Sequence, residues 1–165
     1  MAPFMKKPPD LRSKEEKNKE LVEMFPFILP KNNMTGRVPD NYDYSYTALD
    51  WMPPGWKKKF GLKMCKDIAK SLTRTGNPRK FQIEDIKEKY GALHVYTYGS
   101  TLEIENKILP KYERISQRVC GVCGEPATKI SIAWIYPLCD KCANSGRPNS
   151  YVDIDYFYGE DDGRK

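Results

Sequence analysis

Four cysteines in the C-terminal third of the chain have the spacing of a metal site. Cys120, Cys123, Cys139 and Cys142 form two Cys-x-x-Cys pairs that are separated by fifteen residues. A two-residue spacing lets both thiolates of a pair face one point about 2.3 Å from each sulfur, and two such knuckles complete a tetrahedral zinc site. We therefore predict one zinc ion per chain. Four thiolates leave no coordination position for water, so the predicted zinc is structural.

Two other uses of these thiols fit the sequence less well. Disulfides form in oxidising compartments, and the N-terminus MAPFMKKPPDLRSKEEK lacks the apolar run of a secretory signal. In thioredoxin-like redox proteins, the Cys-x-x-Cys pair lies at the start of a helix in a βαβ unit. Here the segment TKISIAWIYP between the pairs alternates and is rich in β-branched residues. It predicts a β-hairpin that brings the two knuckles together.

The remaining chemistry-bearing residues do not form a catalytic set. His94 is the only histidine, and we expect it to be a half-buried structural residue that shares a strand face with Tyr96 and Tyr98, rather than part of a Ser/His/Asp triad. Cys65 stands beside Met64 at the edge of an apolar helix face, where a small buried hydrophobe is the expected role. The chain also has no Walker-type or dinucleotide-binding glycine loop. We therefore do not expect an enzyme.

Composition and charge are those of a soluble globular protein with an uneven charge distribution. The 165 residues are 39% hydrophobic and 30% charged, and no stretch approaches the roughly 20 apolar residues of a membrane span. We expect an intracellular protein without a membrane partner. The net charge is +6, yet residues 149–163 contain five acidic residues and no basic one. Such asymmetry favours polyanionic partners on one surface and basic partners on another.

The clearest predicted helix covers residues 55–74. Apolar residues recur at every fourth position on one face, at Phe60, Met64, Ile68 and Leu72. The opposite face carries a basic ridge, formed by Lys59, Lys63, Lys66, Lys70 and Arg74. Five cations on one face can follow a phosphate backbone, so the basic ridge is a candidate polyanion contact. Against this, most cationic helix faces are simply solvated, and no stacking aromatics interleave with these cations.

The N-terminal part predicts a short helix and an aromatic loop. The helix begins after Ser13, with Glu16 as the partner in a capping box, and the prolines at 26 and 30 end it. Residues 30–54 mix turn formers with aromatics and have no sustained period, so we expect an ordered loop. The side chains expected to pin it are Tyr42, Tyr44, Tyr46 and Trp51.

Residues 80–98 predict a β-hairpin that turns near Tyr90-Gly91, although IEDIKEKY in its first arm could also form one helical turn. A further helix covers roughly 102–118, and Pro110 is expected to split or kink it. This helix leads the chain into the first cysteine pair. Its expected inward side chains are Leu102, Ile108, Tyr112, Ile115 and Val119.

Together these elements predict an α+β fold of two to three helices and a β-hairpin, closed by a C-terminal four-cysteine zinc ribbon. We expect a flexible segment at 1–12, an α+β body at 13–118, the ribbon module at 119–146 packed on the body, and an acidic aromatic tail at 147–165. The tail is either a disordered solubilising segment or a contact surface. Its candidate contact residues are Tyr151, Asp153, Asp155, Tyr156 and Tyr158.

From about residue 18 to residue 143 the chain resembles a group of small, uncharacterised bacteriophage and prophage proteins. The resemblance rests on FPFILPKN, YDYSYTALDWMPPGWKKKFG, IEDIKEKYGALHVYTYG and the cysteine module ending in WIYPLCDKCA. The first dozen residues and the segment after Gly146 depart from it. The resemblance implies a viral or prophage origin, action in a bacterial host cytoplasm and a zinc site, and it implies no particular activity.

Two functional hypotheses follow. The first is a zinc-stabilised phage accessory protein that binds a host protein or protein–nucleic-acid complex and inhibits or modulates nucleic-acid-handling or defence machinery. It is motivated by the missing catalytic set, by the aromatic loop and by a tail whose aromatic and acidic residues could mimic nucleic acid. The alternative is direct DNA or RNA binding through the basic ridge. The sequence specifies neither the partner nor the oligomeric state.

Overall fold

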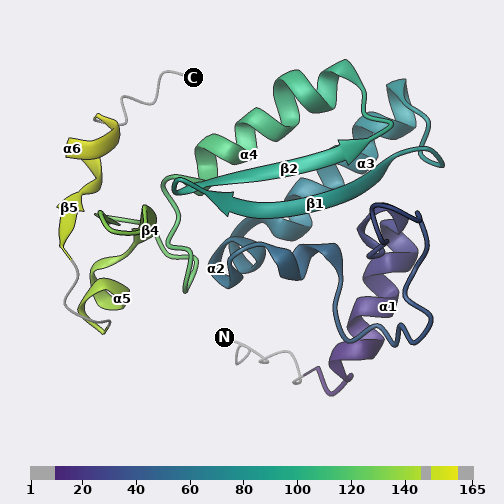
Figure 1. Cartoon of the computed structure of the whole chain (residues 1–165), viewed down its shortest axis with the longest axis horizontal. Coiled ribbons are helices and arrows are strands. Elements are labelled where there is room, and N and C mark those ends of the chain that lie inside the picture. Colours follow the sequence, from purple (N-terminus) through teal and green to yellow (C-terminus); the bar gives the residue numbers. More distant parts are fainter. Residues whose placement is uncertain (1–9, 146–149, 160–165) are drawn as a thin grey trace, which may run out of the picture.

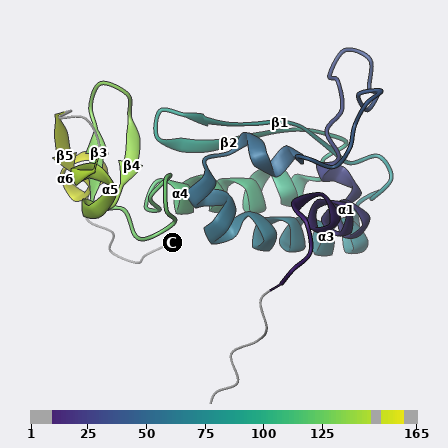
Figure 2. The ribbon, with the colours of Figure 1, turned by 90° about the horizontal axis from the view of Figure 1, so that it is seen from below.

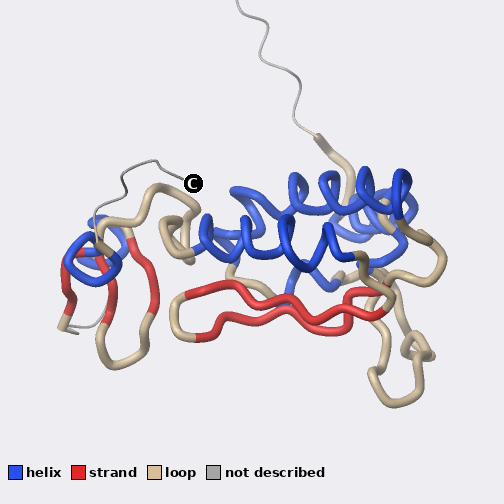
Figure 3. The backbone as a smooth tube through the Cα atoms, turned by 90° about the horizontal axis from the view of Figure 1, so that it is seen from above, coloured by secondary structure: helices blue, strands red, loops and turns tan. Residues whose placement is uncertain are grey.

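A β-hairpin lying on a layer of helices, with a small sheet at one end, makes up the computed structural model, which describes residues 10–145 and 150–159 (Figures 1, 2 and 3). The four clustered cysteines lie next to this small sheet, just outside its strands. The predicted α+β architecture is therefore confirmed. The predicted flexible segment and the predicted tail fall partly outside the described residues.

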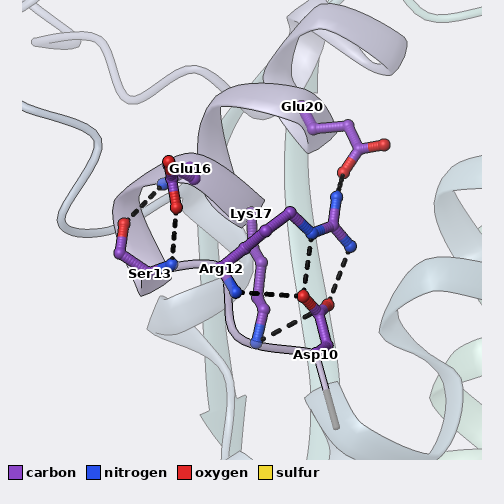
Figure 4. A network of polar contacts seen from close by, with 6 residues as sticks. All are labelled: Asp10, Arg12, Ser13, Glu16, Lys17 and Glu20. Atoms are coloured by element: carbon purple, nitrogen blue, oxygen red, sulfur yellow. Dashed lines mark hydrogen bonds and ion pairs between the residues drawn. The ribbon is translucent and has the colours of Figure 1, made fainter. Parts of the chain in front are cut away.

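Helix α1 (Lys14–Met24) begins with the predicted capping box (Figure 4). The Ser13 N–H donates to Glu16 Oε2 at 2.7 Å, and the Glu16 N–H donates to Ser13 Oγ at 3.1 Å. Two N–H groups that the helix leaves unpaired are thereby satisfied. Upstream, Arg12 forms a salt bridge of 2.8 Å with Asp10. The local sequence is therefore sufficient to start this helix.

The aromatic loop that follows is ordered by its own tyrosines, as predicted. The Tyr42 ring packs against Tyr44 and Tyr46, with centroids 5.0 and 5.5 Å apart. The Tyr42 hydroxyl also donates to the Tyr46 carbonyl at 2.5 Å. The buried Asn18 of α1 donates to the Tyr44 carbonyl at 2.7 Å, which fastens the loop to the helix. A 3₁₀ turn, Ala48–Trp51, ends the loop.

One continuous helical segment forms the centre of the body and confirms the helix predicted at 55–74. It consists of α2 (Pro54–Trp56), a π-helical turn (Lys57–Gly61) and α3 (Leu62–Thr75). The predicted apolar face is buried throughout, at Phe60, Met64, Ile68 and Leu72. The π turn was not predicted, because a sequence wheel assumes 3.6 residues per turn. It holds an extra residue and so changes the angular position of Lys59 relative to the lysines of α3.

Strands β1 (Gln82–Lys89) and β2 (Ala92–Tyr98) form the predicted antiparallel hairpin. Its turn consists of Tyr90 and Gly91, whose φ angles are both positive, at 52° and 79°. Positive φ at both central positions is the signature of the type I′ turn that matches strand twist. The alternative of a helical turn in the first arm is wrong. The turn points toward the cysteine module (Figures 1 and 3).

The helical segment before the cysteines starts at Leu102, contains a π turn (Ile104–Ile108) and ends with α4 (Leu109–Ser116). The expected inward position of Leu102 is wrong, since its side chain is 77% exposed and Ile104 is fully buried instead. At 100° per residue Ile104 falls within about 40° of Ile108, while Leu102 lies about 120° from it, so the helical period itself favours Ile104 as the inward residue. Pro110 lies in the first turn of α4, where a missing N–H is tolerated, so the helix continues through it.

The C-terminal module is a three-stranded antiparallel sheet in the order β4-β3-β5. The predicted hairpin between the cysteine pairs is formed by β3 (Lys129–Ser131) and β4 (Tyr136–Leu138). Strand β5 (Tyr151–Asp153) pairs with β3, and α6 (Ile154–Tyr158) follows it. Residues 151–158, expected in a separate tail, are thus the third strand and last helix of the module.

The main hydrophobic core lies between the hairpin and the helices. Its side chains without exposed surface include Ile28, Trp56, Met64, Ile68, Ile104 and Tyr112. Burying each such side chain contributes roughly 1.5–3 kcal/mol. Among the described residues, no helix has the length and apolar character needed to cross a membrane.

Candidate metal centre

The four cysteines of the predicted site lie together. Their Sγ atoms are all within 4.8 Å of one another, and the Sγ atoms of Cys123 and Cys139 are 3.6 Å apart. Four sulfurs at about 2.3 Å from a central ion form a tetrahedron with edges of roughly 3.8 Å. A disulfide needs sulfurs about 2.05 Å apart, and all four cysteines are free. The four side chains could therefore coordinate a metal ion such as zinc.

The first knuckle is a tight turn that requires glycine at two positions. The Cys120 N–H donates to the Glu125 carbonyl at 2.8 Å, and the Gly124 N–H returns to the Cys120 carbonyl at 2.9 Å. Gly124 has a φ of +84°, which disfavours other residues. At Gly121, an added Cβ would lie 2.3 Å from the Tyr136 ring, so only glycine fits.

The second knuckle is built by the end of a strand and the start of a helix. Cys139 directly follows strand β4 and is the N-cap residue of α5 (Asp140–Asn144). Cys142 lies within that helix. The Ala143 N–H donates to the Cys139 carbonyl at 2.9 Å. Thr128 Oγ1 donates to Asp140 at 2.7 Å and ties the helix back to the chain before β3.

Electrostatics distinguishes Cys120 of the cluster from the fifth cysteine, Cys65. Burial alone would raise the pKa of Cys120, but hydrogen bonds from the backbone N–H groups of Cys123, Cys139 and Val122 outweigh it and hold this pKa at about 7. These donors stabilise the thiolate, which is the form that binds metal. Burial without such donors raises the pKa of Cys65 to about 12. Cys65 is fully buried in the body, as predicted for a small hydrophobe.

The first knuckle docks directly on the start of the central helical segment. The Gly55 N–H donates to the Gly121 carbonyl at 2.8 Å, and the indole N–H of Trp56 donates to the Val119 carbonyl at 2.9 Å. The Trp56 ring also stacks on Tyr136 of the module, with centroids 6.4 Å apart. Trp56 therefore connects the first knuckle to the hydrophobic core of the body.

The sequence analysis did not predict that the first knuckle docks on Gly55 and Trp56. It treated Gly55 only as the start of a helix, yet a Cβ there would lie 2.2 Å from the Cys120 carbonyl oxygen and 2.6 Å from the Gly124 nitrogen. The available signal was a glycine followed by a large aromatic in PPGW, at the start of a helix where glycine is otherwise unfavourable.

The basic ridge is exposed but partly neutralised. All five of its side chains reach the surface. Lys63 lies 3.6 Å from Asp67, and Arg74 forms an ion pair with Glu103. Lys59, the first cation of the ridge, lies beside the knuckle glycine at position 124. Cations that already have carboxylate partners contribute less to binding a phosphate backbone.

The predicted tail contacts are all among the described residues: Tyr151, Asp153, Asp155, Tyr156 and Tyr158. Four of them are engaged within the structure: Asp155 pairs with Arg118, and Asp153 lies 3.9 Å from Lys129. Tyr151 packs against the core next to the cysteines, and the Tyr158 ring lies against Arg118. Tyr156 is 86% exposed and is the most accessible of the five. The segment is thus chiefly a structural part of the module.

Comparison with known proteins adds no family. No family model matches the chain, and neither a curated protein nor a solved structure matches it significantly. The functional argument therefore rests on the residues of this chain.

The docking of the knuckle on Gly55 can be tested by adding one methyl group. We expect Gly55→Ala to lower the free energy of unfolding by about 1–3 kcal/mol, the usual cost of overpacking, because the new Cβ meets backbone atoms that cannot move aside. Urea unfolding measures this loss.

Gly61 provides the matched control in the same helical segment. A Cβ there meets its nearest neighbours at 3.6–3.9 Å, which is ordinary contact. Gly61→Ala is expected to leave stability unchanged or raise it by about 0.5–1 kcal/mol. Equal effects of the two substitutions would contradict the docking contact.

Proposed function

We propose that this protein is a zinc-stabilised binding protein, whose four clustered cysteines hold one structural zinc ion per chain. Four sulfur ligands fill a tetrahedral coordination shell and leave no position for substrate or water. Cys120 and Cys139 are also buried, which limits access to the site. When bound, the ion would cross-link the two knuckles and supply no catalytic group.

The small core of the module supports a stabilising role for the ion. The buried residues around the site are Cys120, Leu138, Cys139 and Ala143, and two of these four are cysteines of the site. The module's other cluster is also small, with Ala127, Ile130 and Ile154 as its buried residues. So few apolar side chains contribute little burial energy, and metal binding then supplies much of the folding free energy of such a module.

Metal analysis tests the zinc ion directly. Protein purified without chelator is expected to contain one zinc per chain by mass spectrometry of the metal. Cys139→Ser should reduce this value to near zero, because three ligands hold zinc much more weakly. Each thiol must lose a proton to bind, so zinc is released as the pH falls.

Cys65→Ala serves as the control for this measurement. It removes a thiol that lies in the core of the body, outside the cluster, and zinc content should not change. Zinc near zero in the unaltered protein, or full retention in Cys139→Ser, would contradict the assignment.

Binding of another macromolecule is supported by a cleft between the tips of the two hairpins. This hairpin-tip cleft is lined by Glu88, Lys89, Tyr90, Ile132, Ala133, Trp134 and Ile135. Its volume is about 380 Å³. Tyr90 is 73% exposed and Trp134 is 71% exposed, and the Trp134 indole N–H donates to Glu88 at 2.8 Å. Exposed, oriented aromatic rings are the side chains that most often dominate binding energy at interfaces.

In this proposal the partner is a protein, or a protein–nucleic-acid complex, of a bacterial host. The protein would act as a phage accessory factor in the host cytoplasm and inhibit or modulate nucleic-acid-handling or defence machinery. The motif resemblance to phage and prophage proteins supports the origin, and the hairpin-tip cleft supports the mode of action.

A pull-down from bacterial host lysate with the full, zinc-loaded chain tests the proposal. Tyr90→Asn with Trp134→Ala removes both rings, while Asn suits the positive φ of the turn. We expect partner recovery to fall at least tenfold, as losing two aromatic anchors predicts.

Met34→Ala is the matched control, because Met34 is a large exposed apolar residue outside the hairpin-tip cleft. It should not reduce recovery of the partner. Recovery of the same partner by the double variant, with unchanged unfolding, would contradict the hairpin-tip cleft as the contact surface.

The alternative function, direct nucleic-acid binding, is favoured by one observation. Three cations of the basic ridge, Lys59, Lys66 and Lys70, form no ion pair with the described part of the chain. If they contact phosphates, reversing all three to Glu should abolish binding to duplex DNA. The unaltered protein should then show a salt dependence with a slope of at least about 2.7, since each phosphate contact adds about 0.9. Unchanged DNA binding by the triple variant would exclude the basic ridge as the contact surface, and no DNA binding by the unaltered protein would exclude this function.

A further inference from the structure

Strand β2 presents an open edge on the side away from β1. The hairpin sheet contains only β1 and β2, and Lys89 pairs with Ala92 beside the two-residue turn. Backbone groups alternate in direction along a strand, so those of Leu93, Val95 and Thr97 point away from β1. The Leu93 N–H confirms this direction, since it donates to Ser116 Oγ of α4 at 2.8 Å.

The backbone groups of Val95 and Thr97, which also point away from β1, are not hydrogen-bonded to a neighbouring element of the described chain. Within residues 10–145 and 150–159, no other element hydrogen-bonds to the backbone of Val95 or Thr97. Both residues are only half-buried, so water or a ligand can reach them. Unpaired N–H and C=O groups in a row are a template for one more strand.

A groove runs along this open edge, because α4 lies beside β2 (Figure 1). Its volume is about 330 Å³, and its walls come from β2 on one side and from the helical segment at 105–113 on the other. This volume is at the lower end of the range for ligand-binding pockets. The β2–α4 groove therefore offers an open strand edge and a helix wall facing it.

The helix wall carries a repeating pattern of charge. Glu105, Leu109 and Glu113 all line the groove, and each is four residues after the last. Neither glutamate side chain forms an ion pair or hydrogen bond with the described residues, and no Lys or Arg lines the groove. Along the helical segment, the wall of the groove therefore presents a carboxylate, then an apolar side chain, then a second carboxylate.

This spacing matches an extended peptide. In α4 the four residues from Leu109 to Glu113 rise about 6 Å, and Glu105 lies one π turn before Leu109. Alternate residues of a strand are about 6.8 Å apart. Residues at positions 1, 3 and 5 of a peptide on β2 would therefore stand opposite Glu105, Leu109 and Glu113. Charge and polarity are complementary when positions 1 and 5 are Lys or Arg and position 3 is apolar.

We propose that the β2–α4 groove binds an extended segment of another protein, with two basic residues four positions apart and an apolar residue midway, as an added strand on β2. The inference rests on the proposed function, and names one surface and the chemistry of its partner. A second copy of the chain is a poor occupant, since β2 (ALHVYTY) contains no Lys or Arg. Pairing of two copies would leave the carboxylates unmatched.

Fluorescence anisotropy with a labelled, end-blocked peptide Thr-Lys-Thr-Val-Thr-Lys-Thr and the full, zinc-loaded chain tests this site. We expect saturable binding, and Glu105→Gln with Glu113→Gln should weaken it about five- to tenfold, as loss of two exposed ion pairs predicts. Glu23→Gln removes an exposed carboxylate of α1 as the matched control and should have no effect. Replacing Val of the peptide by Pro should abolish binding, because the central N–H is lost.

Hydrogen exchange separates strand addition from loose electrostatic attraction. The bound peptide should slow exchange of the Val95 and Thr97 amides and leave the already bonded Leu93 amide unchanged. No saturable peptide binding, equal binding by the double Gln variant, or dimerisation through β2 would overturn the inference. If the peptide fails while the host pull-down still depends on Trp134, the groove is excluded and the proposed function stands. If the peptide binds as expected but the pull-down recovers no partner, the groove is supported and the assignment of a host partner fails.

Discussion

The start of the central helical segment packs directly, backbone against backbone, on the first cysteine knuckle. Gly55 has no side chain, so its main chain can approach Cys120 and Gly124 directly. The neighbouring Trp56 belongs to the main core and is hydrogen-bonded to Val119, just before the knuckle. A metal ion held by the four cysteines would fix the shape of the knuckle, and this contact would transmit that shape to the core. The stability of the metal centre and that of the body are thus thermodynamically linked.

Features that depend on local chemistry could be predicted from the sequence. The four cysteine positions followed from the geometry of two short loops around one ion. The capping box at Ser13 and the turn at Tyr90-Gly91 likewise involve residues within a few positions of one another. The buried face of the central helix followed from its period, because α3 is regular over Met64, Ile68 and Leu72.

Features that depend on distant segments could not be predicted. Strand β5 pairs with β3 although about twenty residues separate them, and nothing in YVD marks its partner. The close approach at Gly55 is likewise visible only once the knuckle is in place. In each case tertiary packing selects among conformations that are locally equivalent.

Trp56 and Trp134 have different surroundings, so their intrinsic fluorescence can report on two different parts of the protein. Trp56 has no exposed surface and lies where the module meets the body, while Trp134 is largely in water. An indole in an apolar site emits at shorter wavelength than one in solvent. The short-wavelength part of the intrinsic fluorescence therefore reports on the body and its joint with the module, where Trp56 and the partly buried Trp51 lie, and the long-wavelength part on the hairpin-tip cleft. A single emission spectrum distinguishes separation of the module from occupation of that cleft without any attached dye.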